Sequence, residues 1–353
     1  MTISLSAPTL WIGTYAGGGG EGAYPLIAAG TAYVAGVPYR DAQNASFGTY
    51  SPRFDVHYLV DERDEGAIGI HRWDGDRWIP LGRVDTGGGA PCHVALDMTQ
   101  SCVAVAHYAS GSVALYRLDP ASGLPIGLPA VYANSGSGPN PERQRSPHAH
   151  WVGFGLDNRF LYVADLGTDA VLAFAFDAEQ GRLAAPVIAF SAVPGSGPRH
   201  LLFHARHPRS AYLACELTSE IVALDVFGAR LHGRKTLSTL PDDWHGANIV
   251  AHIGANAAGD RLYVSNRGHD SIAVFALNAE GELTLLQHVL SGGASPRFFL
   301  LLENEARMVV AHERDHRVTM LDIMPDGTLT PTDIAVTVPG AAFALLATPP
   351  DAR

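Results

Sequence analysis

One alternation of apolar and polar positions recurs along the chain. An apolar run that alternates small and large side chains ends in a polar tip, and a short turn and a second strand-like run follow it. Seven copies can be counted: LWIGTY (10–15), HYLVDER (57–63), CVAVAHY (102–108), FLYVADL (160–166), AYLACEL (211–217), RLYVSNR (261–267) and MVVAHER (308–314). Runs rich in Val, Ile, Ala and Phe with a period of two indicate β-strands joined as hairpins.

A second motif, a small residue or Pro followed by a polar pair and an apolar run, precedes the hairpins. We call it the leading motif; its copies are SPRF (51–54), APCH (90–93), SPHAH (146–150), GPRH (197–200), HGANIVAH (245–252), SPRF (295–298) and PGAAF (339–343). The last copy has no hairpin after it, and the first hairpin has no copy before it. Repeats of about 40–55 residues are typical of four-stranded propeller blades. The sequence therefore predicts an all-β, seven-bladed β-propeller in which the C-terminal strand joins the N-terminal strands in one blade and so removes free sheet edges.

A β-sandwich or a solenoid would contain similar strands, but the matched motifs and their terminal offset favour the propeller. No linker or low-complexity run divides the chain, so we expect residues 1–353 to form one propeller domain. The longest polar excursion, NSGSGPNPERQRS at 134–146, is interpreted as a loop at the rim.

The charge of the chain disfavours nucleic acid as a partner. The formal net charge is −11, whereas a protein that binds nucleic acid needs a basic face. No run of about 18 apolar residues predicts a membrane span, and the N-terminal residues lack the pattern of a signal peptide. Cys92, Cys102 and Cys215 match no CxxC or zinc spacing and suit a reducing compartment. We expect a cytoplasmic monomer or weak homodimer without a cofactor.

In a propeller, equivalent positions of the repeats become neighbours around a central channel. Aligning the ends of the polar-tipped strands gives one column of Thr14, Glu62, His107, Asp165, Glu216, Asn266 and Glu313, and a second of Tyr15, Arg63, Tyr108, Leu166, Leu217, Arg267 and Arg314. The leading motifs add Arg53, His93, His148, His150, Arg199, His200, His252 and Arg297. We predict that the first column forms a ring at one mouth of the channel, where such groups suit anion binding and acid–base chemistry.

Plainer interpretations of these polar residues also exist. Strand ends commonly carry solvated polar groups, and ion pairs among them at a surface contribute little stability. His148 and His150 are two positions apart, which on a strand places them on the same face and raises the question of a metal site. No carboxylate or cysteine at a suitable spacing completes a ligand set, so we expect no metal.

The ordered series IGTY, SPHAH, GPRHLLFH (197–204), AYLACEL, LYVSNR (262–267) and SPRFF (295–299) resembles the seven-bladed propeller lactonase family. That family includes the propeller-type 6-phosphogluconolactonases and the fungal carboxy-cis,cis-muconate cyclases. The resemblance extends from about residue 10 to residue 348, and GPRH followed by a strand ending in Glu-Leu is its most specific part. It implies a hydrolase acting on a sugar-acid or related lactone, with one histidine, two arginines and one glutamate at the channel mouth.

Carried over position by position, the resemblance places the arginines at Arg199 and Arg267 and the glutamate at Glu216. The histidine falls in SPHAH, at His150 by the strand spacing or at His148 by the distance from the proline, and we prefer His150. Contacts with the substrate are further expected from His148, His200, Arg297 and His93. The glycine-rich stretch 17–22, Cys92 and the segment 33–56 depart from the family pattern and leave the substrate open.

The expected chemistry is hydrolysis of an anionic lactone without metal. Arg199 and Arg267 would bind a carboxylate or phosphate, since the guanidinium fork matches such groups. His150 or Glu216 would act as the base, and an arginine would stabilise the oxyanion. The alternatives are a lactonising cyclase or isomerase, and a non-catalytic propeller that binds a protein. A calcium-dependent gluconolactonase would use oxygen ligands such as Asn266, Asp165 and Glu216, but the nearby arginines disfavour a dication.

Overall fold

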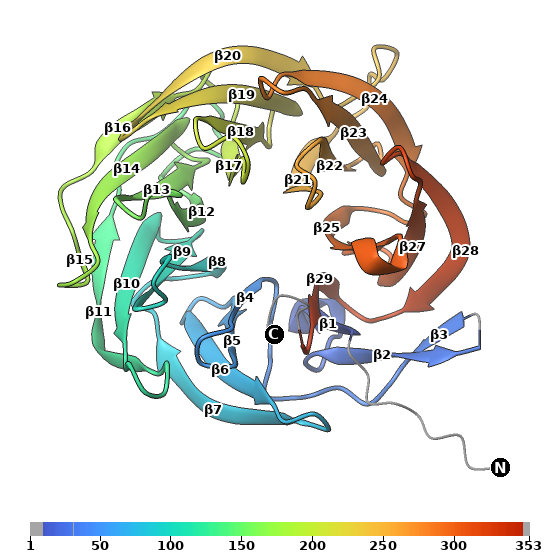
Figure 1. Cartoon of the computed structure of the whole chain (residues 1–353), viewed down its shortest axis with the longest axis horizontal. Coiled ribbons are helices and arrows are strands. Elements are labelled where there is room, and N and C mark those ends of the chain that lie inside the picture. The colour runs from blue at the N-terminus through green and yellow to red at the C-terminus, as the bar shows by residue number, and fades with distance from the viewer. Residues whose placement is uncertain (1–9, 31, 349–353) are drawn as a thin grey trace.

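The computed structural model describes residues 10–30 and 32–348. Its strands form seven sheets arranged in a ring around a central axis (Figure 1). From the axis outward, the first three blades are β4 (Gly48–Ser51), β5 (Val56–Asp61), β6 (Ala67–Trp73), β7 (Trp78–Asp85); β8 (Pro91–Leu96), β9 (Cys102–His107), β10 (Ser112–Leu118), β11 (Pro125–Ala133); and β12 (Ala149–Phe154), β13 (Phe160–Asp165), β14 (Ala170–Asp177), with β15 (Arg182–Leu183) and β16 (Val187–Ser191) sharing the outer position.

The next three blades repeat this order. They consist of β17 (Pro198–Phe203), β18 (Ser210–Cys215), β19 (Glu220–Phe227), β20 (Arg230–Ser238); β21 (Ile249–Ala255), β22 (Arg261–Arg267), β23 (Ser271–Leu277), β24 (Leu283–Leu290); and β25 (Pro296–Leu302), β26 (Arg307–His312), β27 (Arg317–Ile323), β28 (Leu329–Thr337). Among the described residues, helix is limited to two single 3₁₀ turns, η1 (Ala16–Gly18) and η2 (Glu303–Glu305).

The seventh blade joins the two ends of the chain. Its order is β29 (Ala341–Leu346), β1 (Leu10–Thr14), β2 (Tyr24–Ala29) and β3 (Ala32–Ala35). β29 and β1 run antiparallel, with Leu10 opposite Leu346. The predicted seven-bladed propeller and its closure by the C-terminal strand are confirmed. Pairing these two strands closes the ring with backbone hydrogen bonds.

Apolar side chains pack between neighbouring blades, and a repeated tyrosine adds a polar contact there. The Tyr212 hydroxyl of β18 donates to the Gly281 carbonyl in the outer hairpin of the next blade over 2.7 Å. Tyr58, Tyr162 and Tyr263 make the same contact with Gly123, Gly228 and Gly327. These turn glycines have positive φ, a conformation that side chains disfavour. In four of the seven blades, the tyrosine of the second strand thus fixes the outer turn of the blade that follows it.

The prediction that the first SPRF copy, at 51–54, leads into an innermost strand is wrong. β4 already ends at Ser51, and the motif forms the turn into β5, because Ser51 lies opposite Val56 in the hairpin. Arg53 is exposed there and donates to the Thr99 carbonyl over 2.8 Å. It therefore lies at the end of the blade opposite the one that carries Glu62. The second SPRF copy does begin an innermost strand, since β25 starts at Pro296.

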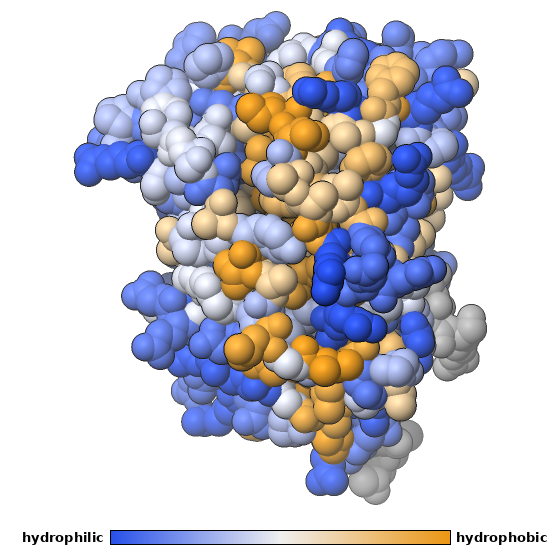
Figure 2. All heavy atoms as spheres, turned by 90° about the vertical axis from the view of Figure 1, so that its left-hand side faces the viewer, coloured by the Kyte–Doolittle hydropathy of each residue, from blue (hydrophilic) through white to orange (hydrophobic). Residues whose placement is uncertain are grey.

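The outer strands face solvent. Figure 2 looks onto the side of the ring that carries β11, β15 and β16, and shows apolar groups among polar ones. β11 contributes the exposed side chains of Ile126 and Leu128, and β16 those of Val187 and Ile188. Among the residues described, no helix has the length and hydropathy needed to cross a bilayer.

Candidate active site at one end of the propeller axis

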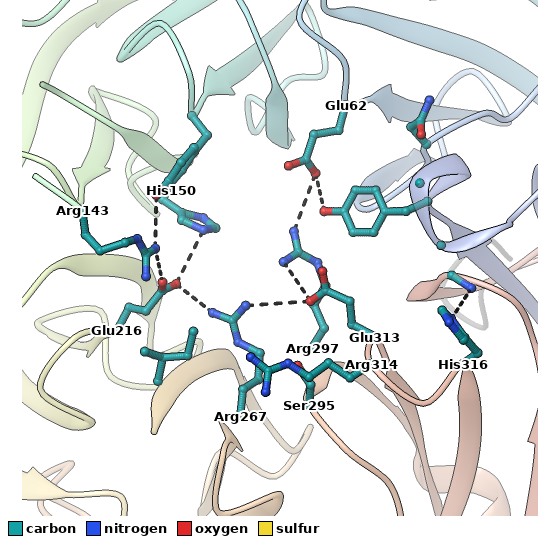
Figure 3. Close-up of a pocket in the computed structure, with 17 residues that line it drawn as sticks. Glu62, Arg143, His150, Glu216, Arg267, Ser295, Arg297, Glu313, Arg314 and His316 are labelled. Atoms are coloured by element: carbon teal, nitrogen blue, oxygen red, sulfur yellow. Dashed lines mark hydrogen bonds and ion pairs between the residues drawn. The ribbon is translucent and has the colours of Figure 1, made fainter. Parts of the chain in front are cut away.

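A cavity of about 840 Å³ opens at one end of the propeller axis. The residues that directly follow the second strands of several blades line it, together with residues from innermost strands and loops. Its ionisable lining groups include Glu62, Arg143, His150, Glu216, Arg267, Arg297, Glu313 and Arg314 (Figure 3).

The predicted ring of strand tips is only partly correct. Glu62, Glu216 and Glu313 line the cavity, but His107, Asp165 and Asn266 do not. His107, Asp165 and Asn266 are equivalent to the residue before the glutamate in the other blades. Asp165, for example, pairs with Ala170 as Cys215 pairs with Glu220, so Asp165 corresponds to Cys215 and not to Glu216. Because side chains alternate between faces, a slip of one residue reverses their direction. The true neighbours of Glu216 in this ring are therefore Tyr15, Glu62, Tyr108, Leu166, Arg267 and Glu313.

The side chains of Asp165 and Asn266 stabilise the hairpin ends instead. Asp165 accepts hydrogen bonds from the backbone N–H groups of His148 and Gly167, at 2.8 and 2.9 Å. The Asn266 amide donates to the Thr239 carbonyl over 2.8 Å. These hydrogen bonds hold the ends of the hairpins, and neither side chain lines the cavity.

A recurring β-bulge directs three of the predicted site residues. The register shifts between Ala149 and Trp151, between Pro198 and His200, and between Pro296 and Phe298. The residues inside these shifts are His150, Arg199 and Arg297. A bulged residue has no partner in the ladder, and its side chain is re-aimed. The leading motifs thus place equivalent residues of several blades towards the axis, and Cys92 occupies the same position in its own blade.

Glu216 is the centre of one wall of the cavity (Figure 3). Its Oε2 accepts hydrogen bonds from Arg199 Nε at 2.7 Å and from Arg267 Nη2 at 2.9 Å, and its Oε1 accepts one from Arg143 Nη2 at 2.6 Å. Burial of the carboxyl opposes ionisation, but Arg267, Arg199 and the other cations outweigh it and hold the pKa of Glu216 well below its usual range. Glu216 is therefore an ionised carboxylate at neutral pH.

Arg199 lies behind Glu216 and is not among the residues that line the cavity. Two residues before it stands Gly197, whose φ of +65° and close approach to Leu217 explain the glycine of GPRH. Besides its bond to Glu216, its Nη1 donates to the Ala251 carbonyl and lies 3.0 Å from His200 Nε2. The expectation that Arg199 contacts a substrate directly is therefore not met by this geometry.

His93 and His200 also lie below the cavity rather than in its wall. Their ring centroids are 5.5 Å apart, and Phe47 stacks on His93 at 4.0 Å. His252 continues this layer of rings, 5.5 Å from His200. Burial, followed by the charges of neighbouring groups, holds the pKa values of His93 and His200 well below the usual value. These histidines form a neutral aromatic floor on the propeller axis.

The two histidines of SPHAH have different surroundings. His150 lines the cavity, with its Nε2 3.8 Å from Glu216 Oε2 and its Nδ1 3.9 Å from Cys92 Sγ. Burial and the charge of Arg199 hold the pKa of His150 well below its usual value, although Glu216 acts in the opposite direction. His148 is not a lining residue: its Nδ1 is 2.7 Å from the Tyr108 carbonyl, and its ring stacks on that of Tyr108.

A second wall faces this one across the cavity (Figure 3). Glu62 accepts hydrogen bonds from the Ser46 hydroxyl and from the Tyr15 hydroxyl, the latter at 2.6 Å. Arg297 lies between Glu62 and Glu313, with N–O distances of 3.6 and 3.8 Å, and stands 5.0 Å over the Tyr15 ring. Burial and the neighbouring Glu62, acting against Arg297, raise the pKa of Tyr15. Tyr15 therefore remains a protonated hydrogen-bond donor.

Sequence reasoning missed Arg143. It comes from the loop 134–146, which was interpreted only as a rim loop, and its Nη2 contacts both Tyr108 Oη, at 3.1 Å, and Glu216. The loop lies outside the repeat, so no alignment of blades points to it. The single sequence signal was the unusual length and basic end of the loop, PERQR.

The charge of the cavity is opposite to that of the chain as a whole. Four arginines and three glutamates line it, and Arg199 lies directly behind. The formal net charge of the protein is −11. Within the part of the chain that the structure describes, no group of three or more His, Cys, Asp or Glu side chains is arranged to hold a metal ion. The site thus combines a local excess of positive charge with a buried neutral imidazole.

The profile of the family described as Lactonase, 7-bladed beta-propeller matches residues 9–345. The chain belongs to this family. It is 29% identical over 343 residues to the 6-phosphogluconolactonase of Bacillus subtilis, which covers 92% of this chain and 97% of that protein. Among solved structures, a protein from Lactobacillus plantarum superposes with a TM-score of 0.86 at 31% identity, covering 96% and 99% of the two chains. The periplasmic gluconolactonase of Pseudomonas aeruginosa does so with a TM-score of 0.86 at 27% identity, covering 97% and 99%.

Proposed function

We propose that this member of the lactonase family hydrolyses a sugar-acid lactone that carries an acidic group, without a metal ion, in the cavity around Glu216. The proposal rests on one observation. Beside His150, in a cavity with an excess of positive charge, Arg267 and Arg297 have N–H donors that make no hydrogen bond to a described residue. Relatives named 6-phosphogluconolactonase and gluconolactonase support a lactone as the substrate class.

Two arginines offer donors to the developing oxyanion. The Nη1 of Arg267 is 4.0 Å from Glu313, beyond hydrogen-bond distance, and makes no hydrogen bond to a described residue, while its Nε is buried without a partner behind it. The contacts of Arg297 with Glu62 and Glu313 are longer than hydrogen bonds. A carbonyl oxygen placed between these guanidinium groups would gain charge-assisted hydrogen bonds as negative charge develops on it.

His150 is the base in this proposal. Its imidazole is neutral at neutral pH, which is the form that accepts a proton. Burial and Arg199 lower the pKa of His150, but Glu216 at 3.8 Å opposes them and would stabilise the imidazolium that results. Water adds its oxygen to the lactone carbonyl carbon and gives one proton to His150. The tetrahedral intermediate then cleaves the ring C–O bond, and the leaving alkoxide takes the proton from His150 to give the open hydroxy acid.

Glu216 has an orienting role in this scheme. Glu216 is a weak proton acceptor, because Arg267, Arg199 and the other cations hold its pKa well below the usual range against the cost of burial. It does, however, fix the directions of three guanidinium groups at once. We therefore assign the base to His150 and the alignment of the arginines to Glu216.

The test is acid release from a panel of phosphorylated, carboxylated and neutral sugar lactones, corrected for spontaneous hydrolysis and assayed with and without EDTA. We expect hydrolysis of the charged lactones to be fastest and unaffected by EDTA. Loss of activity with EDTA that Ca²⁺ restores would replace the proposal with a calcium-dependent mechanism. Absence of turnover on every lactone would reject it.

A further inference from the structure

The loop 134–146 is an inserted segment, yet it is firmly anchored. The buried Gln144 amide donates to the Leu166 carbonyl and to Asp169 Oδ1, both at 2.8 Å, and its Oε1 accepts from the Asn140 N–H at 3.1 Å. Asp169 also accepts hydrogen bonds from the Gly195 and Gly197 N–H groups at 2.7 and 2.8 Å. The loop is therefore tied to the same backbone that leads into Arg199.

Arg143 is presented by this anchored loop and differs from the other two cations on Glu216. Its side chain is 33% exposed, compared with 3% for Arg199 and 11% for Arg267. Its Nη2 contacts Tyr108 and Glu216, while its Nε and Nη1 have no partner among the described residues. Three of its five N–H donors are thus free in a residue that lines the cavity.

Glu216 does not require Arg143 for its charge balance. Arg199 and Arg267 already donate to Oε2, so the carboxylate has two cations in contact without the loop. A third guanidinium adds positive charge on the solvent side of the site. Positive charge in excess of local need, with free donors in a planar fork, is the arrangement that binds phosphate or carboxylate.

We propose that Arg143 determines substrate specificity by binding the acidic substituent of the lactone, at the end remote from the ring carbonyl. This inference rests on the proposed function and separates the role of Arg143 from that of Arg267 and Arg297. Arg267 and Arg297, at the ends of the strands, act on the carbonyl oxygen, and Arg143, on the loop, recognises the phosphate or carboxylate. The substrate class is then a sugar lactone with a phosphate or carboxylate outside the ring.

The kinetic test compares Arg143→Gln with Arg145→Gln. Arg145 belongs to the same loop and is exposed, and among the described residues its side chain donates a hydrogen bond only to the Pro141 carbonyl. Its variant therefore controls for loss of charge on the loop. We expect Arg143→Gln to raise KM for a phosphorylated lactone roughly tenfold or more relative to KM for the neutral lactone. Arg145→Gln should leave this ratio unchanged, and Arg143→Lys should restore it in part, because lysine keeps the charge but not the fork.

An equal loss for charged and neutral lactones, or a fall in kcat with KM unchanged, would overturn the inference and leave Arg143 as a residue that positions Glu216. Calorimetric binding of 6-phosphogluconate and gluconate separates this outcome from failure of the proposed function. If the wild-type protein hydrolyses no lactone but Arg143→Gln still loses affinity for 6-phosphogluconate alone, the function fails and the recognition role stands. If the wild type is a lactonase and the variant binds both acids as tightly as wild type, the inference is wrong.

Discussion

Arg199 Nε donates to Glu216 Oε2 over 2.7 Å, and both side chains are almost completely buried. Arg199 is thus a partner of the carboxylate and not a free binding group. Burial, with Arg267 nearby, lowers the pKa of Arg199 to about 9, while Glu216 acts to raise it. The pair remains ionised at neutral pH because each charge compensates the other.

Replacing Arg199 by Leu should destabilise the fold as well as the active site. Removing one partner of a buried ion pair leaves the other charge uncompensated, at a cost of up to about 3–5 kcal/mol. Arg267 and Arg143 remain on Glu216, so we expect the lower part of this range. Urea unfolding at pH 7 measures it, and the double variant with Glu216→Gln should lose less than the sum of the two single variants. Additive losses would show that the pair does not interact.

His150→Ala should lower kcat about 10²- to 10⁴-fold, the usual effect of losing a general base. Glu216→Gln should also reduce kcat, because the arginines lose their common acceptor. Arg267 and Arg199, acting against burial, hold the pKa of Glu216 well below its usual range. Ionisation of Glu216 should therefore cause no change in the wild-type rate at pH 4–5, and the pH profiles of the wild type and of Glu216→Gln should have the same shape in this range. Unchanged turnover in His150→Ala would refute the assigned base. His148→Ala serves as the control, because His148 lies outside the cavity lining.

Acid should destabilise the protein below about pH 6.5. Burial lowers the pKa values of His57 and His71 to about 4 in the folded state. The unfolded chain then binds more protons between pH 6.5 and pH 4, so the free energy of unfolding is highest above pH 6.5 and falls as pH decreases through this window. Urea unfolding from pH 7.5 to pH 5 measures the slope. His71→Phe should reduce this slope, because it removes one of the two buried imidazoles.

The interblade tyrosines should contribute stability without affecting catalysis. Tyr212→Phe removes the hydrogen bond to the Gly281 carbonyl and should cost about 0.5–1.5 kcal/mol. Tyr24→Phe is the matched control, because Tyr24 is buried in β2 and its hydroxyl makes no hydrogen bond to a described residue. Urea unfolding of both variants, with kcat and KM measured in parallel, gives the comparison. Equal stability of the two variants would contradict the role assigned to the tyrosines.

The fold was predictable because each blade repeats the same buried pattern and the two termini carry complementary halves of one repeat. The carboxylates of the site were predictable for the same reason, since Glu62, Glu216 and Glu313 follow equivalent strands. Their exact column was not, because the end of a strand is uncertain by one residue and one residue reverses a side chain. Arg143 was missed because its contact depends on how an inserted loop folds back, which no repeat encodes.

The two SPRF segments, at 51–54 and 295–298, have the same four residues but lie at opposite ends of their blades. Arg297 is bulged from the innermost strand β25 and approaches Glu62 and Glu313, whereas Arg53 is exposed in the turn after β4. Arg297→Ala should lower kcat/KM for an anionic lactone at least about tenfold, since it removes one of the charge-assisted donors in the cavity. Arg53→Ala should leave kcat/KM within about twofold of wild type, because surface substitutions away from the site have small effects. If both variants lost activity equally, the placement of the site at the Glu216 end of the axis would be wrong.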